Sequence, residues 1–211
     1  MRPYRTLLRR GESEFIVNKS RFIGAGAPAE SEEEARAFLQ QVRALHPAAS
    51  HHCFAYVVGP NMGIMRYSDD GEPGGTAGLP IIETVKSRGV TSLCVVVTRY
   101  FGGVLLGAGG LARAYARGAA QAIDACGVGE MLPTARYLLD IPYPLWSRVE
   151  HYLKSAPVAV DGKTFAETVM LEMSVRVADE DGTLRALAEL SDGALQPLRI
   201  DEAYRPWTAA D

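Results

Sequence analysis

One short segment, Y-S-D-D-G-E-P-G-G-T-A-G, carries three carboxylates and four glycines between Tyr67 and Gly78. Asp69, Asp70 and Glu72 could offer oxygen ligands to a hard cation such as magnesium. The spacing of a calcium-binding loop, D-x-[DN]-x-[DN]-G-x₅-E, is absent. A second interpretation is a tight turn in which a carboxylate accepts a hydrogen bond from a backbone amide. Both interpretations remain open from the sequence.

Two histidines precede a cysteine at His51, His52 and Cys53, which suggests a zinc site or a nucleophile with its base. Successive residues of a strand face opposite sides, so His51 and His52 cannot both reach one ion. We therefore predict no metal site. The residues that would be its candidates are His51, His52, Asp69 and Asp70.

A glycine-rich turn lies in T-R-Y-F-G-G-V-L-L-G-A-G-G-L-A-R-A-Y-A-R, between a predicted strand and a predicted helix. The first amides of a helix lack intrahelical partners and carry partial positive charge, so they can receive a phosphate. The alternative is a helix that packs closely on its sheet and leaves its arginines in solvent. The spacing matches neither a Walker A loop nor a dinucleotide fingerprint. The predicted nucleic-acid or phosphate ligands are Lys19, Arg21, Arg66, Arg99, Gly107, Gly109, Gly110, Arg113 and Arg117.

Composition limits the class of protein. The chain has 211 residues, 47% of them hydrophobic, and a net charge of −3. Residues 1–130 hold 14 Lys and Arg against 12 Asp and Glu, whereas residues 131–211 hold 8 against 13. A polyanion would therefore meet a local patch on the first half. Three cysteines, the lack of a secretory leader and the lack of a long apolar run predict a cytoplasmic protein with no membrane partner.

The elements that must position these residues fall into two groups. Residues 13–24 predict a strand or hairpin, and Ser31 with Glu34 forms a capping box for a helix that Pro47 ends. Further elements of the first group are strands at 52–59 and 92–98, a helix at 76–88 capped by Thr76, and a long helix that ends at Gly127.

After a short connection at 131–135, the predicted order is strand, helix, strand, strand, helix, strand. The ranges are 136–143, 144–155, 157–165, 167–178, 180–190 and 194–201, with Asp161-Gly162 near the middle of a hairpin. This order is the split βαβ pattern. We predict an α+β fold with domains at 1–130 and 136–202 and a loose tail at 203–211.

Several runs resemble the YigZ/IMPACT family: S-R-F-I-G, H-P-A-A-S-H-H-C-F-A-Y, R-Y-S-D-D-G-E-P-G-G-T-A-G and V-V-V-T-R-Y-F-G-G-V-L-L-G-A-G-G-L-A-R-A-Y. Gly74 stands where the resemblance leads us to expect Ser or Ala. The resemblance implies an N-terminal domain like those of ribosomal proteins and GHMP kinases, and a ferredoxin-like C-terminal domain. It also implies a role near translation, with RNA, a ribosome-associated component or a protein as partner.

The first functional hypothesis is a translation-associated regulator that binds RNA through the basic, glycine-rich surface, on which Tyr67, Tyr100 or Phe101 could stack bases. One alternative is an enzyme that acts on a phosphorylated small molecule or nucleotide, and another is a protein-interaction module. We predict no cofactor and name no catalytic residue, and the oligomeric state stays open. The hypothesis requires the acidic segment to lie beside the glycine-rich turn and to orient Arg66 and Arg99.

Overall fold

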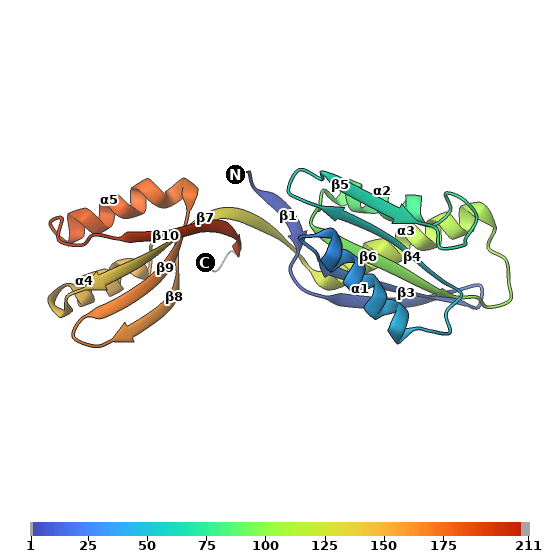
Figure 1. Cartoon of the computed structure of the whole chain (residues 1–211), viewed down its shortest axis with the longest axis horizontal. Coiled ribbons are helices and arrows are strands. Elements are labelled where there is room, and N and C mark those ends of the chain that lie inside the picture. The colour runs from blue at the N-terminus through green and yellow to red at the C-terminus, as the bar shows by residue number, and fades with distance from the viewer. Residues whose placement is uncertain (1, 208–211) are drawn as a thin grey trace. The chain divides into compact units, whose positions relative to one another are not determined.

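A computed structural model describes residues 2–207, which form two compact units (Figure 1). The N-terminal unit is Tyr4–Glu130, and the C-terminal unit begins at Met131 and includes Pro3 near the start of the chain. Each unit combines helices with an antiparallel sheet and has its own hydrophobic core. The predicted α+β class is therefore confirmed.

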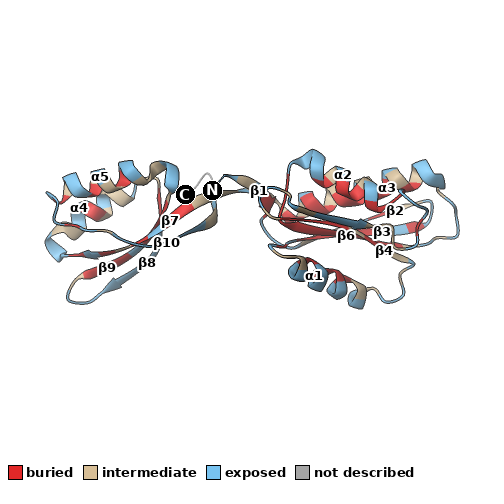
Figure 2. Cartoon of the chain, turned by 45° about the horizontal axis from the view of Figure 1, so that its top comes forward, coloured by how far each residue is buried: buried red, intermediate tan, exposed pale blue. Residues whose placement is uncertain are grey.

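The N-terminal unit is a sheet covered by helices on both faces (Figure 2). Its strand order is β2-β3-β6-β4-β5, with α1 on one face and α2 and α3 on the other. The elements are β1 Tyr4–Leu7, β2 Gly11–Val17, β3 Ser20–Pro28, α1 Glu32–Leu45, β4 His51–Val58, β5 Ile64–Ser68, α2 Gly78–Arg88, β6 Leu93–Tyr100 and α3 Gly107–Cys126.

The central strand of this sheet is β6, which is buried from Leu93 to Arg99. Its apolar run without alternation is typical of a strand covered on both faces. The β2–β3 hairpin turns at Asn18 and Lys19, both with positive φ, which matches the right-handed twist of the strands that they join. The Ser31 hydroxyl accepts the Glu34 amide at 3.1 Å, so the predicted cap of α1 is confirmed.

Helix α3 lies close to the sheet because small residues face each other. A Cβ built on Gly24 of β3 would come 2.3 Å from the carbonyl oxygen of Gly118 in α3. A Cβ on Gly118 would come 2.9 Å from Val97 of β6. Near the middle of α3, glycine therefore allows the helix to pack closely on the sheet. This packing role does not extend to the glycines at the N-terminus of the helix.

The C-terminal unit has the predicted order of elements. β9 lies between β7 and β8, β10 pairs with β7, and α4 and α5 cover one face of the sheet. This is the element order of the split βαβ motif. The elements are β7 Val128–Ile141, α4 Tyr143–Leu153, β8 Val158–Phe165, β9 Val169–Arg176, a 3₁₀ turn Val177–Asp179, α5 Glu180–Leu190 and β10 Leu198–Trp207.

Three predictions for this part of the chain are wrong. The connection expected at 131–135 is part of β7, which is already paired with β9 at Thr134. Residues 203–207 of the expected loose tail belong to β10, where the Trp207 indole donates to the Thr134 hydroxyl at 2.8 Å. Residues 208–211 lie outside the described part. Asp161 is the extra residue of a β-bulge rather than a hairpin turn, and it accepts a hydrogen bond from Ser174.

Two short strands of the N-terminal unit, β1 and β5, were not predicted, because neither shows a sustained alternating pattern. Across residues 2–207, no helix is both long and apolar enough to cross a bilayer.

Candidate functional site

The acidic segment does not act as one group, and Asp69 has a structural role. Its carboxylate accepts the amides of Gly75, Ala77 and Gly78 at 2.9, 3.0 and 2.8 Å, which caps α2. Burial opposes the charged form of Asp69, but these three amides outweigh it and hold its pKa below the usual value. Thr76, the predicted cap, instead donates its hydroxyl to the Pro73 carbonyl. Asp69, seven residues earlier in the chain, caps the helix instead, because the loop folds back onto the start of α2.

Replacing Asp69 with asparagine is expected to lower the free energy of unfolding at neutral pH by roughly 2 kcal/mol, since an amide nitrogen would face backbone N–H groups. The folded-state pKa of Asp69 is depressed, so its stabilisation is complete above the unfolded pKa and is lost as the pH falls through the folded pKa. Urea denaturation at several pH values measures both effects. Asp124→Asn, which alters an exposed ion pair with Arg88, is the control. Equal losses in the two variants, or a difference unchanged in acid, would contradict the capping role.

Asp70 fastens the same loop onto the sheet. Its carboxylate accepts Arg43 Nη2 at 2.9 Å and the His52 amide at 2.6 Å. Its carbonyl oxygen lies 2.9 Å from His51 Nδ1, and because a carbonyl can only accept, Nδ1 carries the proton. Asp70 has a φ of 43°, a strained left-handed conformation that these contacts stabilise.

The arrangement of these side chains argues against the metal and nucleophile interpretations. Within residues 2–207, no three His, Cys, Asp or Glu side chains are grouped to hold a metal ion. Cys53 points into the core, its thiol contacts the Asp69 carbonyl at 3.0 Å, and burial raises its pKa to about 12. A thiol with such a pKa is almost fully protonated at neutral pH, which argues against a nucleophile.

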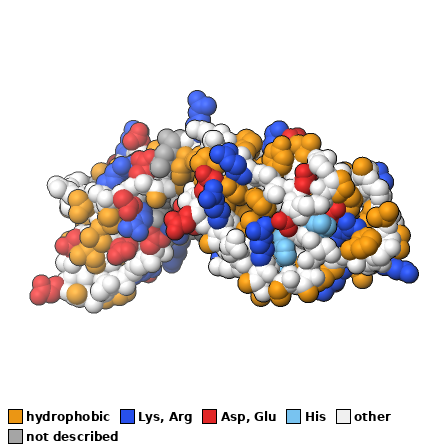
Figure 3. All heavy atoms as spheres, turned by 45° about the vertical axis from the view of Figure 1, so that its right-hand side comes forward, with side chains coloured by type: hydrophobic (Ala, Val, Ile, Leu, Met, Phe, Trp, Pro, Cys, Tyr) orange, Lys and Arg blue, Asp and Glu red, His pale blue; other side chains and the backbone are white. Residues whose placement is uncertain are grey.

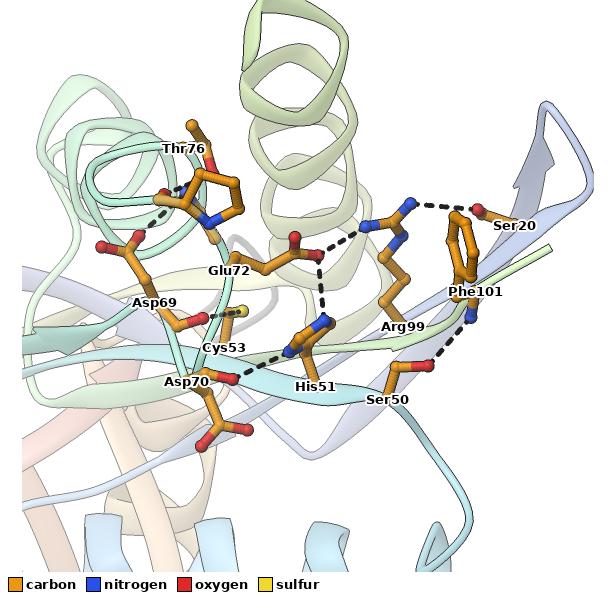
Figure 4. A network of polar contacts seen from close by, with 12 residues as sticks. Ser20, Ser50, His51, Cys53, Asp69, Asp70, Glu72, Thr76, Arg99 and Phe101 are labelled. Atoms are coloured by element: carbon orange, nitrogen blue, oxygen red, sulfur yellow. Dashed lines mark hydrogen bonds and ion pairs between the residues drawn. The ribbon is translucent and has the colours of Figure 1, made fainter. Parts of the chain in front are cut away.

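Glu72 is the carboxylate that pairs with Arg99 (Figure 4), and it lines a pocket together with Gly107 and Ala108 of the glycine-rich turn. Its Oε1 accepts Arg99 Nη1 at 2.8 Å and the Tyr115 hydroxyl at 2.6 Å, and His51 Nε2 lies 3.9 Å away. The side chains of Glu72 and Arg99 are 3% and 5% exposed, so this ion pair is buried. Burial raises the pKa of Tyr115, which keeps its hydroxyl a donor.

The pair forms the floor of a pocket of about 420 Å³. Phe101, Leu105 and Leu106 line its apolar side, and Gly107 and Ala108 bring the start of α3 to its wall. Arg99 Nη2 and the Gly102 amide both donate to Ser20 Oγ at 3.2 Å, which ties the pocket to β3. The structure thus brings the acidic segment, the predicted Arg99 and the predicted Gly107 together at one site.

The start of α3 offers free amides to this pocket. Leu106 occupies the N-cap position and makes no side-chain cap, and the first turn holds no acidic residue. The first amides of a helix have no intrahelical partners, so the pocket wall presents a partial positive charge. Gly107 has a φ of 68°, a value that favours glycine at this turn.

The other predicted ligands lie outside the pocket. Arg66 donates to the Met65 carbonyl, so the prediction that the acidic segment orients it is wrong. Arg21 pairs with Glu14 at 2.7 Å, and Arg117 lies over the ring of Phe15. Two basic residues border the site more closely: the Lys19 backbone lies against Gly102, and Arg113 lies beside Gly109.

Sequence reasoning missed the residues that complete the floor. The hydrogen bond from Tyr115 to Glu72 depends on the approach of α3 to the loop. Ser20 lies 79 residues from Arg99, and only the pairing of β3 with β6 brings them together. No local spacing in the sequence signals either contact.

Comparisons with known proteins agree with this architecture. The Impact N-terminal domain matches residues 18–123, and a domain of unknown function (DUF1949) matches residues 139–194. The IMPACT family member YvyE of Bacillus subtilis is 36% identical over 92% of this chain and 89% of its own length. The chain belongs to the IMPACT family. The site described above thus lies within the matched IMPACT domain.

Other members of the IMPACT family match equally broadly. The IMPACT family member YigZ of Escherichia coli is 37% identical over 88% of this chain and 92% of its own length. A crystal structure described as that of a hypothetical protein has a TM-score of 0.61 and 35% identity, and the match covers 95% of this chain and 98% of that one. Membership of the family supports, in broad terms, a role in the regulation of translation.

Proposed function

We propose that this IMPACT-family chain binds single-stranded RNA, with one nucleotide entering the pocket between Glu72, Arg99 and the start of α3. The observation that carries the proposal is the uncapped N-terminus of α3, whose Gly107 and Ala108 line the pocket. Such an end favours a phosphate, because its free amides donate hydrogen bonds and the helix dipole attracts negative charge.

The charge balance of the pocket supports an anionic ligand. The negative charge of Glu72 is paired with Arg99 at 2.8 Å, so the carboxylate repels a nearby phosphate less than an unpaired one would. Lys19 and Arg113, both exposed, border the glycine-rich turn and can neutralise phosphates on either side. Basic, acidic, hydrophobic and histidine side chains lie side by side on the face of the N-terminal unit seen in Figure 3.

The apolar rim supports a ligand that carries a base. Phe101 is 48% exposed and Leu105 is 84% exposed, so large apolar side chains stand at the pocket mouth. A base that is not paired or stacked in a helix can stack on such a surface, which is how proteins commonly read single-stranded RNA. The Phe101 amide donates to Ser50 Oγ, which fixes the start of the loop.

The proposal predicts that Ala108→Asp weakens RNA binding about tenfold without destabilising the fold. An aspartate in the first turn of α3 adds a favourable charge for the helix, whereas it repels a bound phosphate. Repulsion of roughly 1.4 kcal/mol corresponds to this factor of ten. Fluorescence anisotropy with a labelled single-stranded RNA measures the affinity, and thermal denaturation measures the stability.

Ala108→Asn is the matched control, because it has nearly the same shape without the charge. We expect it to bind RNA close to the wild-type level, with an affinity that falls steeply as salt rises. If the two variants bind equally well, or the wild-type chain does not bind RNA at low salt, the proposed function is wrong.

A further inference from the structure

The carboxylate of Glu72 uses only one of its two oxygens. Oε1 receives Arg99 and Tyr115 and lies nearest His51, and Figure 4 shows the contacts from Arg99 and His51 meeting on that same oxygen. Among residues 2–207, no group donates a hydrogen bond to Oε2. Glu72 lines the pocket, so a donor to Oε2 would have to come from a ligand in that pocket.

The surrounding groups cannot easily turn to satisfy Oε2. His51 is held through Nδ1 by the Asp70 carbonyl, and Tyr115 already donates its one hydroxyl proton to Oε1. Arg99 donates to Glu72 and Ser20, and its buried Nε has no partner. A carboxylate oxygen in so buried a side chain is costly to leave without a donor. The pocket is therefore suited to a ligand that brings an N–H group to Oε2.

A nucleotide can supply both a phosphate for α3 and an N–H donor for Glu72. Guanine presents an imino N–H and an amino group side by side on its pairing edge, and both can approach a carboxylate. Uracil carries its single imino N–H between two carbonyl oxygens, which a carboxylate repels. Adenine and cytosine each offer an amino group next to a ring acceptor.

Resting on the proposed RNA binding, we propose that Glu72 is a specificity-determining residue that selects guanine in single-stranded RNA. The base enters the pocket from its apolar rim and directs its amino edge to Oε2. The ion pair with Arg99 orients the carboxylate, so its free oxygen faces the base in a fixed direction.

The test compares short uridine-rich oligonucleotides that differ at one central position, which is guanosine, inosine, adenosine or uridine. Inosine lacks only the amino group of guanosine and is therefore the matched probe. With the full wild-type chain, we expect guanosine to bind about tenfold more tightly than inosine and to bind most tightly of the four. Glu72→Gln, checked for folding by thermal denaturation, is expected to lose this preference and to keep part of its overall affinity.

The outcomes separate this inference from the proposed function. If all four oligonucleotides bind with equal affinity, RNA binding stands and the role of Glu72 is wrong. If guanosine is preferred but Glu72→Gln, shown to be folded, keeps the same preference, the base is read elsewhere and the inference is also wrong. If none of the four binds, the proposed function fails and the inference fails with it.

Discussion

Replacing Arg99 with methionine is expected to lower the free energy of unfolding of the N-terminal unit by roughly 3–5 kcal/mol. The substitution leaves the Glu72 carboxylate 3% exposed without its cation, and an unpaired buried charge is strongly destabilising. It also removes one of the two donors to Ser20, which accepts from Arg99 and Gly102. Urea denaturation, followed by circular dichroism, measures the loss.

The double variant Glu72→Gln with Arg99→Met provides the control for this prediction. Removing the charge of Glu72 along with that of Arg99 should recover much of the stability lost in the single variant, because no buried charge is then left unpaired. If Arg99→Met alone costs less than about 1 kcal/mol, within the range of exposed ion pairs, the buried pair does not exist as described.

Replacing Gly102 with alanine is expected to have a comparably large effect, of about 3 kcal/mol or more. A Cβ at this position would come 2.0 Å from the carbonyl carbon of Lys19 and 2.1 Å from its oxygen. These atoms belong to the backbone of the β2–β3 turn and cannot move aside as a side chain end can. The glycine-rich turn would have to move away from Ser20 and lose the hydrogen bond between them. RNA affinity should therefore fall together with the melting temperature.

Gly74→Ala is the matched control for this substitution. A Cβ at Gly74 meets nothing within 4 Å, and its φ is not in the left-handed region. We expect a change in the free energy of unfolding of less than about 0.5 kcal/mol, as for most surface substitutions. Equal melting temperatures for the two alanine variants would contradict the close contact between Gly102 and the hairpin.

Much of the architecture could be predicted from local patterns. The capping box at Ser31 and Glu34, the apolar run of β6 and the order of elements in the C-terminal unit follow from periodicity and turn chemistry. The errors arise where tertiary pairing overrides local signals. A short connection was predicted at 131–135, but this segment lies within β7, and pairing with β7 also makes residues 203–207 a strand.

The site was predictable only in part. Residue types singled out Glu72, Arg99 and Gly107, and folding brings these three to one pocket. The sequence could not separate them from Asp69 and Asp70, because the three carboxylates differ only in direction: one caps α2, one holds Arg43, and one faces the pocket. These directions depend on the path of the loop over β4, and the spacing of residues in the sequence does not predict that path.

The central claim is that the start of α3 receives the phosphate of a bound RNA nucleotide. Titration of the ¹⁵N-labelled chain with a short single-stranded RNA, followed through its backbone amide and arginine side-chain resonances, tests it most directly. We predict that the largest shifts fall on Gly107, Ala108 and Gly109 and on the Arg99 side chain, and that they diminish as salt is raised. Shifts confined to other residues, with those of the α3 amides unchanged at saturation, would contradict the account.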